Sequence, residues 1–356
     1  MIRAIVKHGY ILQSWEKKVG THLLKAIGLV AAMAAVGPAH AEVKEIRMLE
    51  AGGPSGESVE VGYIAPFTKK TGISVVRESP AGLGKLRAMV ESGKINAPIV
   101  ELSDGEFEQA KALNLLEPLD WKSIDPAPIF EEAQDRYGIG WQYYATIMAW
   151  RPDAKAPEKW ADLWDVDNFP GKRTFPNYPN YIVPMALIAD GVPLDKLYPL
   201  DLDRAFAKLD KIKEHVAVWW DAGAQPPQLL LDNEVQYAVS WSGRVTDAEG
   251  VKYTYDQGQL GLTYFGIPKG TPDDVKQAVY RLMHEVTIAE NQGAAAKIIS
   301  YTGPSKNLDA LLPQDKLDKF PTVKQNRDVG FLNNAKWWHE HAEEVELRWQ
   351  EFKLGL

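Results

Sequence analysis

The alternation of short apolar strands with helices is the feature that most constrains the fold of this chain. Near the N-terminus, the alternation in residues 46–49 predicts a strand, and the glycine-rich run 52–56 predicts a loop. A helix is expected to follow as far as Lys70, and residues 73–76 predict a second strand. A strand, a helix and a strand in this spacing form a βαβ unit, and such units build parallel sheets covered by helices. The chain is therefore expected to adopt an α/β fold.

The same alternation continues and then begins a second time near Trp160. Further strands are predicted at residues 99–102, 137–150, 216–220, 235–241 and 260–268, and further helices at 83–91, 106–112, 185–189, 201–213, 225–231, 272–289 and 291–299. Residues 117–128 have no period and are expected to be extended, whereas the last part of the chain is expected to be mostly helical. Two α/β regions joined by extended crossovers are typical of a two-lobed protein with a hinge.

The first 41 residues are predicted to be a secretory signal peptide. A basic opening segment precedes an apolar run from Ile27 to Gly37, and Ala39-His40-Ala41 fits the pattern of a cleavage site. The alternative is a membrane anchor, but the apolar run is about half the length that a bilayer requires. The protein is therefore expected in the periplasm, and the lack of cysteine near the cleavage site argues against a lipid anchor.

The charge and the cysteine content of the chain exclude several kinds of site and partner. Removing a leader of net charge +4 from a chain of net charge −8 leaves −12. Because an acidic protein without a basic patch repels a phosphate backbone, no nucleic-acid partner is expected. The absence of cysteine excludes disulfides, thiolate metal ligands and thiol nucleophiles. About 315 residues without disulfides must bury a large core, which favours two lobes over one.

Five stretches resemble a known family when they are taken together. They are PFTKKTGISVV, WADLWDVDNFPGK, YAVSWSGR, GLTYFGIPKGT and YTGPSKNLDALLP, and their order and spacing resemble the periplasmic solute-binding proteins of ABC importers, extracellular solute-binding family 1. They are most similar to the spermidine/putrescine-binding subgroup. The resemblance implies a two-lobed type II periplasmic-binding-protein fold with hinge crossovers, which traps its ligand between the lobes. It places lobe one at 42–148 plus 262–307 and lobe two at 149–261 plus 308–356.

The residues expected at the cleft argue against a polyamine ligand. The resemblance implies that polyamine-binding members hold a dication with acidic side chains and aromatic rings. Tyr178 and Tyr181 stand where those members carry an Asp and a Glu, and Thr263 replaces a further Asp. Arg244, on a turn after a strand, can offer its guanidinium to a carboxylate. An amino acid, an opine-like conjugate or an organic acid is therefore favoured, and a polyamine stays as an alternative.

Several other residues are candidates for contact with the ligand. Trp241 and Tyr301 match cleft positions of the family, and Ser103 follows a buried strand. The loop that contains Gly53 and Ser55 would offer backbone N–H groups to carboxylate oxygens. The alternatives remain open at this point. Trp241 can be a core residue, the glycine-rich loop can be a plain turn, and Arg244 can form a surface ion pair with Asp247.

The adjacent pair Tyr143-Tyr144 raises a second hypothesis. A related group of periplasmic proteins binds ferric ion through an adjacent tyrosine pair, although that pair lies later in those chains. Tyr144 is also a candidate for contact with an organic ligand. A ferric-ion-binding protein is therefore the alternative function.

Motifs of enzymes are absent from the sequence. His339 and His341 are two residues apart, which places them on different sides of a helix, and no His-x-x-x-His or Gly-x-Ser-x-Gly pattern occurs. A secreted hydrolase is therefore only a third hypothesis. We expect no enzyme activity, no resident metal and no cofactor. The expected partners are a small-molecule ligand and an inner-membrane ABC permease, and the protein is expected to be a monomer.

Overall fold

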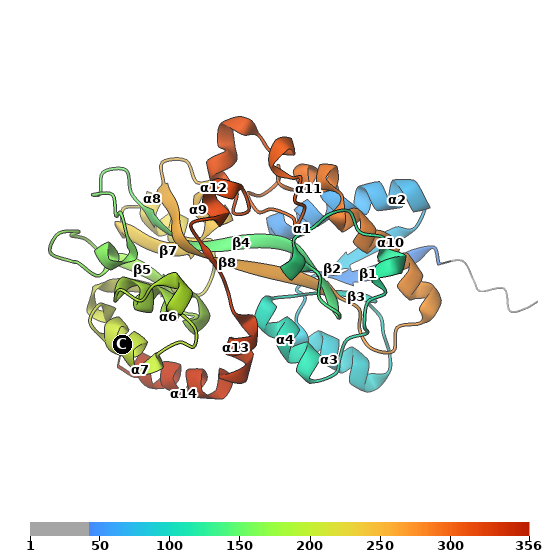
Figure 1. Cartoon of the computed structure of the whole chain (residues 1–356), viewed down its shortest axis with the longest axis horizontal. Coiled ribbons are helices and arrows are strands. Elements are labelled where there is room, and N and C mark those ends of the chain that lie inside the picture. Colours follow the sequence, from blue (N-terminus) through green and yellow to red (C-terminus); the bar gives the residue numbers. More distant parts are fainter. Residues whose placement is uncertain (1–42, 356) are drawn as a thin grey trace, which may run out of the picture. The chain divides into compact units, whose positions relative to one another are not determined.

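Two long antiparallel strands form the centre of the structure, a computed structural model that describes residues 43–355 (Figure 1). Strand β4 (Gly138–Trp150) pairs with β8 (Lys252–Gly266) from the pair Gly138 and Gly266 to the pair Trp150 and Lys252. The register shifts between Gly140 and Gln142 and again between Thr146 and Met148. Because β4 is buried along almost its whole length, its sequence is nearly continuously apolar.

In residues 43–355, nine strands form one mixed sheet in the order β2-β1-β3-β8-β4-β7-β5-β6, with β9 paired to β8. The remaining strands are β1 (Glu45–Leu49), β2 (Ser74–Glu78), β3 (Ile99–Leu102), β5 (Arg173–Pro176), β6 (Val216–Trp220), β7 (Tyr237–Trp241) and β9 (Phe331–Leu332). Strands β1, β2 and β3 are mutually parallel, as are β5, β6 and β7. The two parallel groups lie on opposite sides of the β4–β8 pair, which confirms the predicted α/β class.

Helices cover both faces of each parallel group (Figure 1). The helices are α1 (Gly53–Val59), α2 (Ala65–Thr71), α3 (Leu83–Ser92), α4 (Asp104–Ala112), α5 (Trp121–Ile124), α6 (Pro179–Ala189), α7 (Leu202–Asp210), α8 (Gln225–Leu231), α9 (Ser242–Val245), α10 (Asp273–Thr287), α11 (Ala289–Ala295), α12 (Lys324–Arg327), α13 (Ala335–Glu340) and α14 (Ala342–Lys353). Met48 of β1 packs with α2 and α10, whereas the next residue, Leu49, packs with α3 and α4. Alternation along a strand thus supplies both layers of the core.

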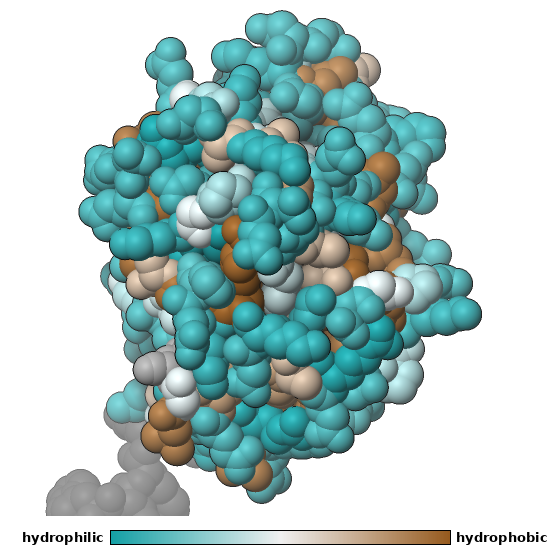
Figure 2. Space-filling model, turned by 90° about the vertical axis from the view of Figure 1, so that its left-hand side faces the viewer, coloured by the Kyte–Doolittle hydropathy of each residue, from teal (hydrophilic) through white to brown (hydrophobic). Residues whose placement is uncertain are grey.

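The other parallel group is covered in the same way. Val239 of β7 lies in a large apolar cluster with α6, α7, α13 and α14, and its neighbour Ala238 lies in a smaller cluster with α8 and α9. The C-terminal residues Trp349 and Phe352 pack against Phe206 of α7 in the larger cluster. Hydrophilic residues cover most of the face shown in Figure 2, and hydrophobic residues appear there only in small separate areas. The large core expected of a chain without disulfides is present.

The glycine-rich run 52–56 was predicted to be a loop, and this prediction is wrong. Helix α1 begins at Gly53 and continues through a π-helical turn (Glu60–Ile64) into α2. Gly52 turns the chain with a φ of 83°, a conformation that suits glycine, and Pro54 lies in the first turn of the helix, where a missing N–H costs nothing. The glycine and proline residues that predicted a loop therefore lie at the beginning of a helix.

Other boundaries also differ from the expectations. Helix α6 begins at Pro179 rather than at residue 185, β8 begins at Lys252 rather than at residue 260, and the extended segment 117–128 contains the short helix α5. The predicted signal peptide lies outside the described residues. Among residues 43–355, no helix has the length and apolar character needed to cross a bilayer. The lobe boundaries expected from the resemblance stay a prediction.

Candidate functional site

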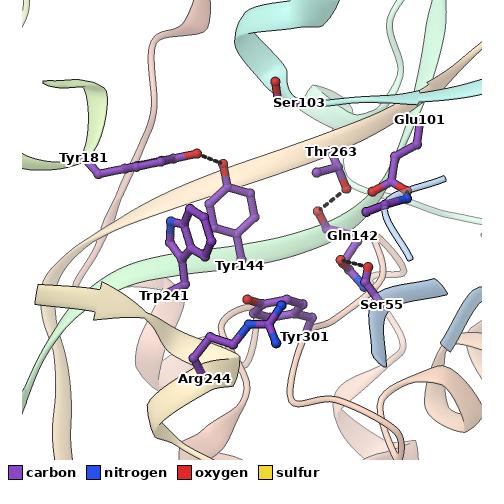
Figure 3. Close-up of a pocket in the computed structure, with 11 residues that line it drawn as sticks. Ser55, Glu101, Ser103, Gln142, Tyr144, Tyr181, Trp241, Arg244, Thr263 and Tyr301 are labelled. Atoms are coloured by element: carbon purple, nitrogen blue, oxygen red, sulfur yellow. Dashed lines mark hydrogen bonds between the residues drawn. The ribbon is translucent and has the colours of Figure 1, made fainter. Parts of the chain in front are cut away.

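A cavity of about 210 Å³ lies where the two parallel groups meet the β4–β8 pair (Figure 3). Its lining comes from β3 and α1 on one side, from α6, β7 and α9 on the other, and from β4 and β8 between them. The lining residues are Ala51, Ser55, Glu101, Ser103, Gln142, Tyr144, Tyr181, Trp241, Arg244, Thr263 and Tyr301.

Strand geometry explains how these residues reach one cavity. Gln142 and Tyr144 are two residues apart on β4, so both face the cavity, whereas Trp141 and Tyr143 between and beside them face the apolar core. Trp241 is the last residue of β7, and α9 follows at once. The carboxyl ends of strands in an open α/β sheet are where ligand sites usually form.

Aromatic rings form one wall of the cavity. The Tyr144 and Tyr181 hydroxyl oxygens lie 3.0 Å apart and share a hydrogen bond. The Trp241 ring centroid lies 5.6 Å from that of Tyr181 and 6.4 Å from that of Tyr144. Burial raises the pKa of both tyrosines well above the usual value, so their hydroxyls stay protonated at neutral pH. The wall is therefore uncharged, and it can pack against methylene groups.

Arg244 is the cation of the cavity. It lies on the short helix α9, and its guanidinium extends beside the Tyr301 ring (Figure 3). Burial raises the pKa of Tyr301 to about 12, although the positive charge of Arg244 opposes this rise. Within residues 43–355, Arg244 Nε is buried without a hydrogen-bond partner, and Arg244 forms no ion pair. The positive charge of Arg244 can therefore pair with a carboxylate that enters the cavity.

The alternative role of Arg244, a surface ion pair with Asp247, is not observed in residues 43–355. Asp247 instead accepts hydrogen bonds from the Ser300 backbone N at 3.1 Å and from Ser300 Oγ at 2.6 Å. Lys319 Nζ lies 3.3 Å from the same carboxylate. Because Asp247 is held by these partners, the guanidinium of Arg244 is left to the cavity.

Glu101 is the carboxylate of the cavity, and the sequence analysis did not single it out. It is 5% exposed, and its Oε2 accepts a hydrogen bond from the Ala51 backbone N at 2.8 Å. Burial raises its pKa to about 8; the Ala51 N–H opposes this rise, and the carboxylates of Glu50 and Glu106 add to it. A charged residue inside the buried strand sequence Ile-Val-Glu-Leu is the signal that would have pointed to it.

The remaining polar groups of the cavity are neutral. Ser55 Oγ donates to Gln142 Oε1 at 2.9 Å, and Thr263 Oγ1 donates to the Gln142 backbone O at 3.3 Å. Ser103 caps α4 and forms a capping box with Glu106. Ser55, Gln142 and Thr263 are held by one another and Ser103 is held by Glu106, so their positions do not depend on a ligand.

The cavity brings together all but two of the predicted ligand-binding residues. Gly53 lies at the start of α1 and does not line it. Tyr178 lies against Trp241, with ring centroids 6.2 Å apart and planes inclined by 28°, and its hydroxyl donates to the Asp221 backbone O at 2.6 Å. Ala51, Glu101 and Gln142 also line the cavity and were not predicted from the sequence.

The adjacent tyrosines Tyr143 and Tyr144 point to opposite sides of β4. Tyr144 lines the cavity, whereas Tyr143 Oη donates to Glu132 Oε1 at 2.8 Å beside the apolar core. The two phenol oxygens therefore do not converge on one point. In the part of the chain that the structure describes, no group of three or more histidine, aspartate or glutamate side chains is arranged to hold a metal ion.

Comparison with known proteins places the chain in a family. The family model for bacterial extracellular solute-binding proteins matches residues 62–324. The γ-aminobutyric acid-binding protein of Pseudomonas aeruginosa is 32% identical over 91% of this chain and 94% of that protein.

Solved structures agree with this assignment. An ABC transporter substrate-binding protein from Bradyrhizobium japonicum has a TM-score of 0.80 and 32% identity over 86% of this chain and 99% of its own. The periplasmic binding protein AgtB from Agrobacterium tumefaciens, in complex with agropinic acid, has a TM-score of 0.73 and 25% identity over 86% and 98%. The spermidine/putrescine-binding protein PotD from Streptococcus pneumoniae has a TM-score of 0.69 at 19% identity, which shows the shared fold alone.

The matches to the family model and to the γ-aminobutyric acid-binding protein extend over most of the chain, and the neighbouring structures share its two-lobed fold. The chain belongs to the bacterial extracellular solute-binding proteins, as a two-lobed substrate-binding component of an ABC transporter that captures a small polar organic solute.

Proposed function

We propose that the solute is a small amino-acid-like compound with a carboxylate group, and that Arg244 binds this carboxylate. The observation that carries the proposal is the guanidinium of Arg244, which lines the cavity without an acidic partner in residues 43–355 and whose Nε is buried without a hydrogen-bond partner there. A guanidinium favours a carboxylate because its fork donates two parallel hydrogen bonds. The surrounding rings of Trp241 and Tyr301 would pack against the carbon chain of the solute.

The similar proteins support a carboxylate-bearing solute. The Pseudomonas aeruginosa relative is named a γ-aminobutyric acid-binding protein, and AgtB was solved in complex with agropinic acid. Both of these compounds are organic acids. A polyamine fits this cavity poorly. Two ammonium groups would meet a single lining carboxylate, Glu101, and the positive charge of Arg244 would repel them.

The proposal includes the cellular setting of the protein. The leader at residues 1–41 would direct export to the periplasm, where the protein acts as a monomer without enzyme activity and without a nucleic-acid partner. Lobe one (42–148 plus 262–307) and lobe two (149–261 plus 308–356) would close on the solute and present it to an inner-membrane ABC permease. The match to an extracellular solute-binding family supports this setting.

The test is the affinity of Arg244 variants for γ-aminobutyrate, measured by isothermal titration calorimetry. Arg244→Ala is expected to weaken binding more than tenfold, which corresponds to about 1.4 kcal/mol. Arg244→Lys keeps the charge but loses the bidentate fork, so it is expected to fall between the alanine variant and the wild type. Unchanged affinity in Arg244→Ala would remove the carboxylate from this end of the cavity.

A control variant separates this effect from a general loss of positive charge. Arg47 lies on β1 and pairs with Glu78 at 2.6 Å on the exposed surface. Arg47→Ala is expected to leave affinity unchanged because a surface ion pair contributes little and lies outside the cavity. A thermal-shift screen over amino acids, organic acids and polyamines would rank the solute classes, since a ligand that binds only the folded state raises its melting temperature.

A further inference from the structure

Glu101 is a carboxylate with an open side. Its Oε2 is occupied by the Ala51 N–H, whereas no hydrogen bond to Oε1 is found in residues 43–355. The side chain is nearly buried in the protein but lines the cavity, so the free oxygen can meet a molecule bound there. Burying a carboxylate is costly unless a partner is present. The proposed binding of a carboxylate by Arg244 does not explain why a carboxyl group is buried at Glu101.

Glu101 and Arg244 approach the cavity from opposite ends. In Figure 3, Glu101 descends from β3 on the side of Ser55 and Gln142, and Arg244 rises from α9 on the side of Trp241. The Tyr301 ring lies beside the Arg244 guanidinium, and the Tyr144 ring lines the same cavity next to Trp241 (Figure 3). A molecule that meets both must carry a negative and a positive group separated by an apolar stretch.

We propose that Glu101 binds the ammonium group of an ω-amino acid whose carboxylate lies on Arg244, and that Glu101 releases its proton to solvent when this ion pair forms. The inference rests on the proposed function, because Arg244 must hold the other end of the same solute. It narrows the solute class. In an α-amino acid the two charges sit on neighbouring carbons and reach one end only, whereas methylene groups between them let an ω-amino acid reach both.

The negative charges around Glu101 favour the protonated form of its carboxyl group. Glu50, at the end of β1, and Glu106, on α4, are negative and lie close enough to disfavour a third negative charge. The charge of Glu50 is partly balanced by Arg77 at 3.2 Å, and Arg77 in turn lies 3.5 Å from Glu60. The residue opposite Glu101 on β8 is the uncharged Phe265.

The positive charge that would stabilise ionised Glu101 therefore comes with the ligand. Its pKa of about 8 means that the carboxyl group is mostly protonated at neutral pH in the empty cavity. An ammonium group at Oε1 favours the ionised form, so the proton leaves as the ion pair forms. Binding of an ω-amino acid and loss of one proton are thus a single linked equilibrium, whereas binding of a simple carboxylate involves Arg244 and leaves Glu101 protonated.

The first experiment compares matched ligands by calorimetry. β-Alanine, γ-aminobutyrate and δ-aminovalerate are titrated beside propionate, butyrate and valerate, which lack only the amino group. The wild type is expected to prefer the best ω-amino acid over its matched carboxylate by more than about tenfold, and Glu101→Gln is expected to reduce this preference to about threefold or less. Glu101→Gln retains an acceptor for the Ala51 N–H, so it preserves the local fold.

Glu60→Gln is the control for a lost negative charge. Glu60 lies in the π-helical turn with its side chain 45% exposed, beside Arg77 rather than in the cavity. It is expected to keep the full preference. A preference that survives in Glu101→Gln would overturn the inference, as would equal loss in the two variants.

The second experiment measures the proton directly in the wild-type protein. Titrations at neutral pH in buffers of different ionisation enthalpy are expected to show nearly one proton released with γ-aminobutyrate and none with butyrate. As pH increases, affinity for γ-aminobutyrate is expected to rise about tenfold per pH unit until about pH 8 and to stay constant above that pH. A flat pH profile without proton release would overturn the inference whether or not the variant folds.

The outcomes separate this inference from the proposed function. If both ligand sets bind the wild type equally and Arg244→Ala weakens both, the proposed binding of the carboxylate by Arg244 is supported and the proposed binding of the ammonium group by Glu101 is wrong. If none of these ligands binds the wild type, the proposed carboxylate class fails and the inference fails with it.

Discussion

At the scale of single residues, the hydroxyl pair of Tyr144 and Tyr181 holds the aromatic wall together. Each hydroxyl is the hydrogen-bond partner of the other at 3.0 Å; Tyr144 is buried, and Tyr181 is partly buried against it. Tyr181→Phe would leave the Tyr144 hydroxyl without this partner in an apolar setting. We expect a loss of about 1–2 kcal/mol in the free energy of unfolding, measured by urea denaturation.

The control for this substitution is Tyr253→Phe. Tyr253 Oη donates to Asp318 Oδ2 at 2.7 Å, and this hydrogen bond is exposed, so water can replace the lost hydroxyl. The expected loss is below about 1 kcal/mol. Equal effects of the two substitutions would mean that the Tyr144–Tyr181 pair contributes nothing specific.

The sequence pointed to Tyr181 and Arg244 but not to Glu101, and the reason is physical. Arg244 was found because an arginine directly after an apolar strand is a local anomaly, and Tyr181 because the resemblance assigns its position to the ligand. Glu101 faces the cavity only through the pairing of β3 with β8, whose residues lie far away in the chain. An acid inside an apolar strand sequence marks Glu101 as unusual, but the local sequence does not show which side of the sheet its side chain faces.

At the scale of elements, the approach of α9 to Tyr301 determines how Trp241 and Arg244 are presented. Gly243 lies in α9, and a Cβ at this position would lie 2.6 Å from Cε1 of the Tyr301 ring. Gly243→Ala must therefore displace either the ring or the helix. We expect this variant to lose more than about fivefold in affinity for γ-aminobutyrate and to alter tryptophan fluorescence, because Trp241 directly precedes α9.

Gly84→Ala is the matched control on another helix. Gly84 lies in α3, and a Cβ there would have no atom within 4 Å. Alanine is expected to stabilise this helix by about 0.5–1 kcal/mol without a change in affinity. If Gly243→Ala keeps the wild-type affinity, the close approach of α9 to the Tyr301 ring is not needed for binding.

Elements whose signals are local were predicted well, and those that depend on distant pairing were not. Strand β3 and helix α8 match their predicted ranges residue for residue. The first half of β8 contains Asp256, Gln257 and Gly258, which interrupt both the apolar pattern and the pairing with β4, and the pairing resumes at Thr254. Helix α6 begins six residues before the predicted start and contains Pro184, and its buried side chains stabilise the whole helix.

At the scale of the whole molecule, the C-terminal segment connects parts that are far apart in the chain. Asn333 Nδ2 donates to Asp104 Oδ2 of α4 at 2.6 Å, and Asn333 Oδ1 accepts from Gln259 Nε2 of β8 at 2.7 Å. Tyr198 Oη donates to the same oxygen at 3.3 Å. Helix α13 then packs on α4, and α14 packs on α6 and α7. No local pattern in the sequence predicts this network, because each contact depends on the completed sheet.

The buried carboxyl of Glu101 is also expected to affect the stability of the whole molecule. Its pKa is raised from 4.5 to about 8 in the folded protein, so between these values the folded state binds more protons than the unfolded state. Stability must then fall as pH rises through this window. The size of the fall attributable to Glu101 is on the order of a few kcal/mol. Glu101→Gln has no such proton, so its stability relative to the wild type should increase with pH.

Urea denaturation of both proteins from about pH 4.5 to about pH 8 measures this difference, because the titration of all other groups cancels in the comparison. Saturating γ-aminobutyrate should increase the stability of the wild type more near pH 8 than near pH 4.5, since its ammonium group stabilises the ionised carboxylate. A constant difference between the two proteins across the window would mean that Glu101 titrates in the fold as it does in the unfolded chain. The cavity would then stabilise a negative charge there without a ligand, and the coupling of solute to proton would be absent.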